Sequence, residues 1–261
     1  MRNCNAQRPA TQQVCAFLSD YSAWLLGCGA TCIRLENNVR RMAEAYDMEV
    51  EITIMPRHVH ISVCDRERAE NVTSIASVRH TAVSFNLNTM LSTLSWEVAD
   101  GKRTFEEARI RLDAITRNDS QNKWTVLFLV SIANAAFCRL FGGDGIAMII
   151  VCMATLAGYY LKQIMLERDA DIRMVVLACS FVSTVIGATD ILFSLGNTPD
   201  IALATSVLYL IPGIPFLNSF SDMLYRHYIC AFSRFADAAI LTGCLSAGLC
   251  GGMTLMNVRM F

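Results

Sequence analysis

Long apolar runs dominate the second half of the chain. They cover residues 124–141, 146–161, 174–195, 201–220 and 235–256. A helix needs about 20 mainly apolar residues to cross the hydrocarbon core of a bilayer. The pattern therefore predicts five transmembrane helices, and the second is long enough only if it extends to Ile164.

The first half has shorter repeats. Residues 12–46 predict two helices separated by a turn at 27–30, and Leu35, Val39 and Met42 share one face of the second helix. Alternation of apolar and polar residues, followed by a return to helical spacing, predicts two or three strands and then two more helices. In chain order these are 50–54, 58–64, 74–86, 86–99 and 104–115. Thr104 and Glu107 have the spacing of a capping box.

Charge divides the chain at the same place. Residues 1–123 carry 30 of the 45 Lys, Arg, Asp and Glu side chains, and the 54% hydrophobic share exceeds that of ordinary soluble proteins. We therefore predict a membrane protein with an N-terminal α+β cytoplasmic domain (1–122) followed by a five-helix transmembrane bundle (123–261). A net charge of −1 provides no basic surface for nucleic acid, so we expect no such partner.

Basic residues in the short loops indicate the orientation. The loops after the second and fourth apolar runs contain basic residues, whereas the loops at 142–145 and 196–200 contain none. The basic residues are Lys162, Arg168, Arg173, Arg226 and Arg234. The N-terminal domain is thus expected in the cytoplasm, and the first 16 residues lack the apolar core of a cleaved signal peptide.

The fourth apolar run contains a helix-breaking sequence at its centre. Pro212 and Pro215 flank Gly213, and each proline removes an amide donor and clashes with the carbonyl four residues earlier. We expect a broken helix whose freed carbonyls, near Leu208 and Ile211, face protein or a watery cavity. The second half-helix would direct its positive end at the gap, which suits a carboxylate.

Polar residues follow this break at helical spacing. Asn218, Asp222 and Arg226 recur every four residues, so they would share one face. One interpretation is a substrate path, in which the substrate contacts the break from Pro212 to Asn218, including Gly213 and Pro215, and Asp222 is a proton or polar path group. The other is a packing kink with an Asp222–Arg226 ion pair at the cytoplasmic surface, and the local sequence supports both equally. Asp190, near the end of the third apolar run, is a second candidate path residue because acids are costly in a bilayer.

Enzyme and metal chemistry have little support. His58 and His60 would point to the same face of a strand, but no third metal ligand has matching spacing, and His80 and His227 have no sequence reason to join them. The 11 cysteines lack zinc or redox spacing, and no catalytic motif of the common families occurs. We therefore predict no metal, no cofactor and no enzymatic activity.

Two sets of residues resemble motifs of the threonine/serine exporter-like (ThrE-like) family. One lies in the first domain, and the other follows the break in the fourth apolar run. The first set is Gly29, Ala30, Arg34, Glu36 and Arg40, and the second is Pro212, Gly213, Pro215, Asn218, Asp222 and Arg234. With five predicted spans, the chain is similar to the YjjP-type subunit of the split form of this family.

The resemblance implies a function and partners. It implies a bacterial inner-membrane exporter of small carboxylates, either threonine and serine or succinate, driven by a cation gradient. It also implies a second small membrane subunit of the YjjB type. Separately, Gly243, Ala247 and Gly251 recur every four residues in the fifth apolar run, which favours packing within the chain and leaves a homo-oligomer open. The alternative is a membrane-anchored sensor or assembly protein whose cytoplasmic domain binds a ligand. Such an anchor has no need of a broken helix.

Overall fold

The structure of the protein is a computed structural model that describes residues 9–79, 83–117 and 122–258. Its contacts divide the chain into two compact units. The N-terminal unit combines Met1–Asp119 with Ile214–Phe235, and the C-terminal unit combines Ser120–Gly213 with Ala236–Phe261. Segment 214–235, which belongs to the apolar half of the sequence, therefore packs with the first domain. The boundary at residue 123 stays a prediction.

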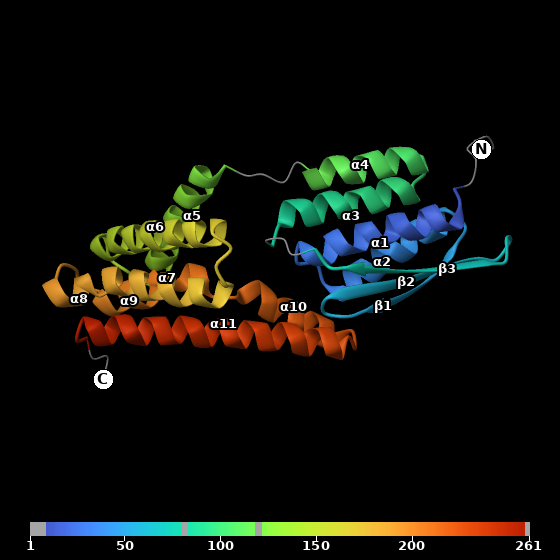
Figure 1. Ribbon diagram of the computed structural model, residues 1–261. Coiled ribbons are helices and arrows are strands. Elements are labelled where there is room, and N and C mark those ends of the chain that lie inside the picture. Colours follow the sequence, from blue (N-terminus) through green and yellow to red (C-terminus); the bar gives the residue numbers. More distant parts are fainter. Residues whose placement is uncertain (1–8, 80–82, 118–121, 259–261) are drawn as a thin grey trace. The chain divides into compact units, whose positions relative to one another are not determined.

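The N-terminal unit consists of helices and one small sheet (Figure 1). Its elements are α1 (Thr11–Gly27), α2 (Cys32–Ala45), β1 (Glu49–Ile54), β2 (His58–Asp65), β3 (Glu70–Ser77), α3 (Phe85–Ala99), α4 (Phe105–Arg117), α10 (Gly213–Leu224) and the first two turns of α11 (Tyr228–Leu255). The two early helices and the later pair confirm the sequence prediction. The third strand lies earlier than expected, because β3 ends at Ser77; residues 80–82 of the expected strand are outside the described residues.

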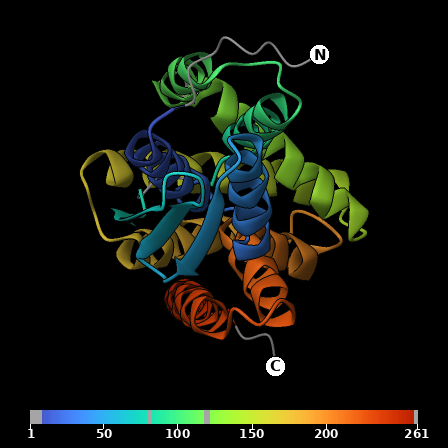
Figure 2. The ribbon, with the colours of Figure 1, turned by 90° about the vertical axis from the view of Figure 1, so that its right-hand side faces the viewer.

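The sheet is antiparallel, in the order β1, β2, β3, and its inner face supplies much of the core. Val63 pairs with Val50 on one side and with Val72 on the other, so apolar side chains line up across the strands. Ile61 is fully buried beneath α1, which packs against β2 and β3 (Figures 1 and 2). The outer face carries polar side chains, as strand alternation requires.

The C-terminal unit is helical in its described part. Its helices are α5 (Lys123–Leu140), α6 (Gly145–Glu167), α7 (Ile172–Gly187), α8 (Thr189–Phe193), α9 (Pro199–Ser206), the 3₁₀ turn η1 (Leu208–Leu210) and most of α11. Among the described residues four helical segments are long and apolar enough to cross a membrane, or five if the bent pair formed by 199–210 and 213–224 is one span. Four of the five predicted spans are therefore found, the fifth depends on counting the bent pair as one span, and α6 does extend past Ile164.

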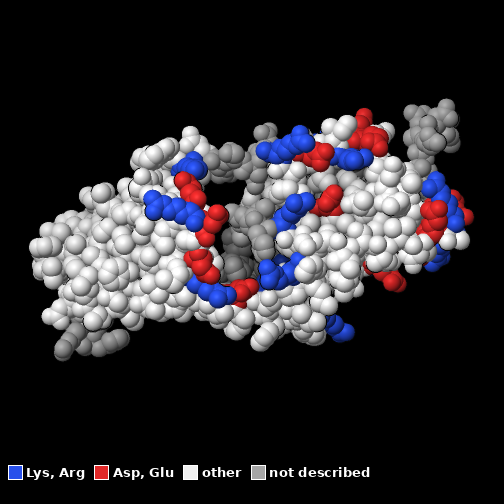
Figure 3. Space-filling model, in the orientation of Figure 1, with Lys and Arg blue, Asp and Glu red and all other residues white. Residues whose placement is uncertain are grey.

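Close helix packing in this unit depends on glycine. A side chain at Gly248 would lie 2.4 Å from the Leu177 carbonyl oxygen, whereas one at Gly243 would meet nothing within 4 Å. Gly248 therefore serves the contact between α11 and α7. Figure 3 shows the face of this unit as an uncharged surface with a belt of charged residues at one end. Where α5 begins and α6 ends, Lys123 and Glu167 form an exposed ion pair.

Candidate functional site

The apolar run with two prolines is interrupted where the sequence predicts. Helical structure stops at Leu210, Ile211 is extended, and α10 begins at Gly213. The prolines explain this, because neither Pro212 nor Pro215 can donate to a preceding carbonyl. The break therefore separates α9 and η1 from α10.

The carbonyls freed by the break are satisfied within the protein. The Leu208 carbonyl accepts from the Ile211 amide at 3.2 Å, and the Ile211 carbonyl accepts from the Gly213 amide at 2.8 Å. The Thr205 carbonyl, in the last turn of α9, accepts from the Asn134 side chain at 3.1 Å. Hydrogen bonds within the turn and from Asn134 therefore satisfy the carbonyls that were expected to face protein or a watery cavity.

Beyond the break, α10 is strongly two-sided. Ser219 and Asp222 are buried, and the Ser219 hydroxyl donates to the Ala231 carbonyl at 2.8 Å. Leu217 and Phe220 lie 71% and 62% exposed. Arg226 does not continue the polar face, because α10 ends at Leu224 and Arg226 has a left-handed backbone (φ 66°). The expectation of a shared Asn218, Asp222 and Arg226 face is therefore wrong for the arginine.

Asp222 is the centre of the polar face of α10. Its side chain is fully buried, and one oxygen accepts from the Cys32 amide, 2.8 Å away, in the first turn of α2. The other oxygen lies 2.9 Å from the Arg234 guanidinium of α11. A helix N-terminus and a cation both stabilise a carboxylate, so this buried charge is compensated on both sides. The expected ion pair is thus formed with Arg234, instead of Arg226.

The turn between α1 and α2 makes two further contacts with the same segment. The Asn218 side chain donates to the Gly29 carbonyl, and Arg234 donates to the Ala30 carbonyl, both at 2.8 Å. Gly29 has φ +89°, a left-handed conformation that favours glycine. The two sets of motif residues, about 190 positions apart in sequence, therefore meet. We call this group the clasp: Gly29, Ala30, Cys32, Asn218, Asp222 and Arg234.

The other motif residues of α2 lie around the clasp. Glu36 is 3.7 Å from the ring nitrogen of His227, which follows α10. Arg34 donates to the Asn88 side chain at 2.8 Å, and Arg40 is exposed. Within the clasp, a hydrogen bond with Cys230, burial and the Asp222 carboxylate all raise the pKa of the Cys32 thiol. This thiol is therefore protonated at neutral pH.

Asp190 lies in the other unit, apart from the clasp residues. It is fully buried and accepts from the Gly196 amide at 2.8 Å through one oxygen. Its second oxygen has no hydrogen-bond partner among the described residues. A second acid, Asp144, lies close to Asp190. A side chain at Gly196, between α8 and α9, would come within 3.2 Å of both carboxylates. Amide hydrogen bonds from Ala147 and Asn197 lower the pKa of Asp144, which caps α6.

Neutral polar contacts inside the C-terminal unit escaped the sequence analysis. The Asn134 amide donates to the Thr155 hydroxyl at 2.6 Å, and the Ser183 and Tyr209 hydroxyls are 2.9 Å apart. The available signal was a single amide in the middle of an apolar helix, which indicates a hydrogen bond between helices.

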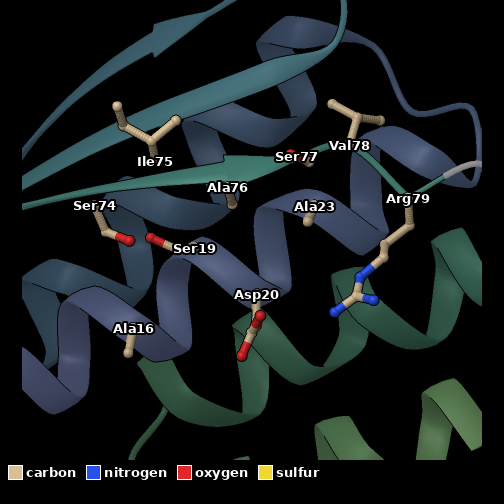
Figure 4. A pocket seen from close by; sticks show the side chains of 10 residues that line it. All are labelled: Ala16, Ser19, Asp20, Ala23, Ser74, Ile75, Ala76, Ser77, Val78 and Arg79. Carbon is tan, nitrogen blue, oxygen red and sulfur yellow. The ribbon is translucent and has the colours of Figure 1, made fainter.

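A groove of about 550 Å³ lies between α1 and β3 (Figure 4). Asp20 and Arg79 are its charged side chains, and the remainder are small or apolar. It contains none of the residues expected from sequence to form a site. His58 and His60 are on β2, and the described residues contain no group of three or more side chains that could hold a metal ion.

Several helices long enough to cross a membrane, together with an apolar helix broken at two prolines, are typical of membrane transporters, and comparison with known proteins gives the same class. The ThrE family model, described as "Putative threonine/serine exporter", matches residues 16–256. The chain belongs to this family. The family description is that of a transporter and not of an enzyme, which is the class that the sequence resemblance indicated.

Two curated relatives are similar to part of the chain. Both are named "Probable succinate transporter subunit YjjP", one from Escherichia coli (strain K12) and one from Klebsiella aerogenes. Each is 30% identical over 138 residues, which are 52% of this chain and 54% of the relative. The matched region thus spans about half the length of these relatives. No solved structure matches the chain.

Proposed function

We propose that the protein is one subunit of a bacterial inner-membrane exporter of small carboxylates. The substrate would be threonine, serine or succinate, and the chain would work with a second small membrane subunit of the YjjB type. The family description and the word "subunit" in the relatives' names support this proposal. The N-terminal domain would face the cytoplasm, with the basic loop residues on the same side.

The clasp is the observation that carries the proposal. Arg234 holds a buried carboxylate, Asp222, and keeps 22% of its own side chain exposed. A guanidinium has five N–H donors, so it can also bind a substrate carboxylate. In our proposal Asp222 and the substrate compete for Arg234. Protonation of Asp222 frees the guanidinium, and its ionisation displaces the substrate.

Other groups around Asp222 fit this exchange. The Cys32 amide would still hold one carboxyl oxygen when the proton is bound, so α10 keeps its place against α2. Glu36 and His227 lie close to each other at the turn that follows α10, and they would contribute to the charge around Asp222. Pro212, Gly213 and Pro215 would set the start of α10, and Asn218 would hold that helix to the turn at Gly29. Asp190, a buried acid, is our second candidate proton group.

Efflux from preloaded cells tests the role of Asp222. In cells that express this chain with its proposed partner, Asp222→Asn should lower the efflux of labelled succinate or threonine at least tenfold. The asparagine can still accept from the Cys32 amide, but it cannot exchange a proton. Asp169→Asn is the matched control, because Asp169 is exposed and its left-handed backbone (φ 54°) suits asparagine.

Amounts of each variant in the membrane would be measured in parallel. Unchanged efflux of Asp222→Asn at normal protein levels would refute the proposed role of this carboxylate. If neither the pair of subunits nor this chain alone releases any of the three labelled substrates, the exporter assignment itself is wrong.

A further inference from the structure

A second hollow of the N-terminal unit differs in chemistry from the groove beside β3. It has a volume of about 580 Å³ and lies between α2, α3 and α10. Most of its lining side chains are polar, and two of them are arginines. The lining residues on α2 are Ile33, Arg34, Asn37, Asn38 and Arg41, preceded by Thr31; those on α3 are Thr89, Ser92, Thr93 and Trp96; those on α10 and just after it are Ser221 and Tyr225.

The residues that line this groove recur at the same spacing along α2 and along α3. Polar residues of α2 occupy positions i, i+3, i+4 and i+7 from Arg34 to Arg41, and α3 repeats this spacing from Thr89 to Trp96. Side chains at this spacing share one face of a helix. The groove is therefore built from two matched polar faces. Its arginines are two turns apart, which is about 10 Å along the axis of α2.

Both guanidinium groups are held in place by neutral partners. Arg34 donates to Asn88 at 2.8 Å, and Arg41 donates to Asn38 at 3.1 Å and to Ser95 at 2.8 Å. Arg41 also stacks on Trp96, with its central carbon 3.6 Å from the ring centre. Fixing the guanidinium before a ligand arrives reduces the entropy lost on binding.

Neither arginine forms an ion pair with a carboxylate of the described residues. Each keeps N–H donors that its neutral partners do not use. Asn37, Ser92 and Thr93 add further hydrogen-bonding groups along the groove. The groove thus presents two cations with spare donors and no anion of its own, which is the chemistry that recognises carboxylate groups.

We propose that this groove is a binding site for a small dicarboxylate, with one carboxylate at Arg34 and the other at Arg41. The hydroxyl and amide groups between them would donate further hydrogen bonds to the two carboxylates. Ser221 and Tyr225 would bring the ligand into contact with α10, directly beside Asp222 of the clasp. This inference goes beyond the proposed function, because the site would bind ligand whether or not the chain transports it.

Calorimetric titration of the purified full-length chain in detergent tests the site. Succinate should bind, and Arg34→Gln or Arg41→Gln should weaken its binding about tenfold or more, as expected for the loss of a charge-assisted hydrogen bond. Arg111→Gln is the control, because Arg111 is exposed on α4 and outside the groove. It removes the same charge and should leave succinate binding unchanged.

Two other probes sharpen the result. Acetate, with one carboxylate, should bind far more weakly than succinate, and inorganic phosphate should not match succinate. Equal binding of either probe would overturn the assignment to dicarboxylates. Failure of succinate to bind the unmodified chain, or equal weakening by Arg111→Gln, would overturn the site.

Hydrogen exchange of the unmodified chain provides a test that needs no variant. Bound succinate should slow exchange in the facing turns of α2 and α3, 34–41 and 89–96, and leave α4 unchanged. Protection elsewhere without protection here would also overturn the site. Because these are binding measurements, their failure is distinguishable from a failure of efflux.

Discussion

The two units bury polar groups in different ways. In the N-terminal unit a full charge is buried, since Asp222 is inaccessible and is stabilised by Arg234 and a helix N-terminus. In the C-terminal unit the internal polar contacts are mainly neutral, as between Asn134 and Thr155. Asp190 is the exception, and it forms no ion pair with the described residues. The contrast is between a unit that contains a buried ion pair and one whose buried contacts are mainly between hydroxyls and amides; the Lys123–Glu167 pair of the C-terminal unit is exposed.

Apolar residues show the opposite contrast. Ile61 and Leu35 of the N-terminal unit are fully buried, as in a water-soluble core. In the C-terminal unit only 22% of the apolar window of α5 is buried, and Ile149 of α6 is 66% exposed. Exposed isoleucine is costly in water and favourable in hydrocarbon. The surface of the second unit is thus suited to lipid.

The difference indicates where each unit obtains its stability. Water drives apolar side chains into the first core, whereas in lipid this drive is absent between helices, and close packing and hydrogen bonds take its place. Glycine at position 248 and the Asn134 contacts are of that kind. Substitutions of the same chemical type should therefore have different effects in the two units.

The largest effect is expected at the buried ion pair. Arg234→Met would leave the Asp222 carboxylate buried without its cation, and breaking such a pair costs about 3–5 kcal/mol. Thermal unfolding of the full chain in detergent would show the loss as a lower midpoint.

A second substitution separates charge from packing. Asp222→Asn in the Arg234→Met background removes the uncompensated charge and retains the acceptor for the Cys32 amide. Most of the stability should therefore return. A double variant as unstable as Arg234→Met alone would show that the arginine stabilises the protein through its packing. The buried charge would then no longer distinguish the N-terminal unit from the C-terminal unit.

Much of the fold follows from sequence periodicity. Leu35, Val39 and Met42 mark the buried face of α2, and all three are fully buried. Thr104 and Glu107 form the expected capping box, with reciprocal hydrogen bonds of 2.9 and 3.4 Å. These features are local, because capping and amphipathic spacing depend on residues within two turns. The displaced third strand was harder, since its pairing with β2 is decided by a partner outside the segment.

The site was predictable only as a set of residues. The sequence points to Asp222 and Arg234 through their resemblance to family motifs, but no spacing rule connects them to the turn at Gly29. Helical spacing gave the wrong partner, Arg226, because it assumed that α10 continues past Leu224. Contacts between segments about 190 residues apart depend on the tertiary fold, which local patterns do not encode.

An identical substitution in the two cores would sharpen the comparison further. Ile61→Ala should destabilise the chain by about 2–5 kcal/mol, because it leaves a cavity in a core that cannot collapse fully. Ile149→Ala, on the exposed side of α6, should change the unfolding midpoint little, since its side chain contacts detergent or lipid. Equal losses at the two positions would contradict the assignment of the α6 surface to lipid.

The smallest effect is expected for a neutral hydrogen bond inside the C-terminal unit. Asn134→Ala removes the bonds to Thr155 and to the Thr205 carbonyl. Hydrogen bonds between membrane helices contribute about 0.6 kcal/mol on average and about 1.7 at most, because the separated helices also find partners. A cycle with Thr155→Val would isolate the side-chain pair from the carbonyl contact. A loss from Asn134→Ala as large as that from Arg234→Met would mean that neutral and charged groups stabilise the two units equally, and the contrast between them would fail.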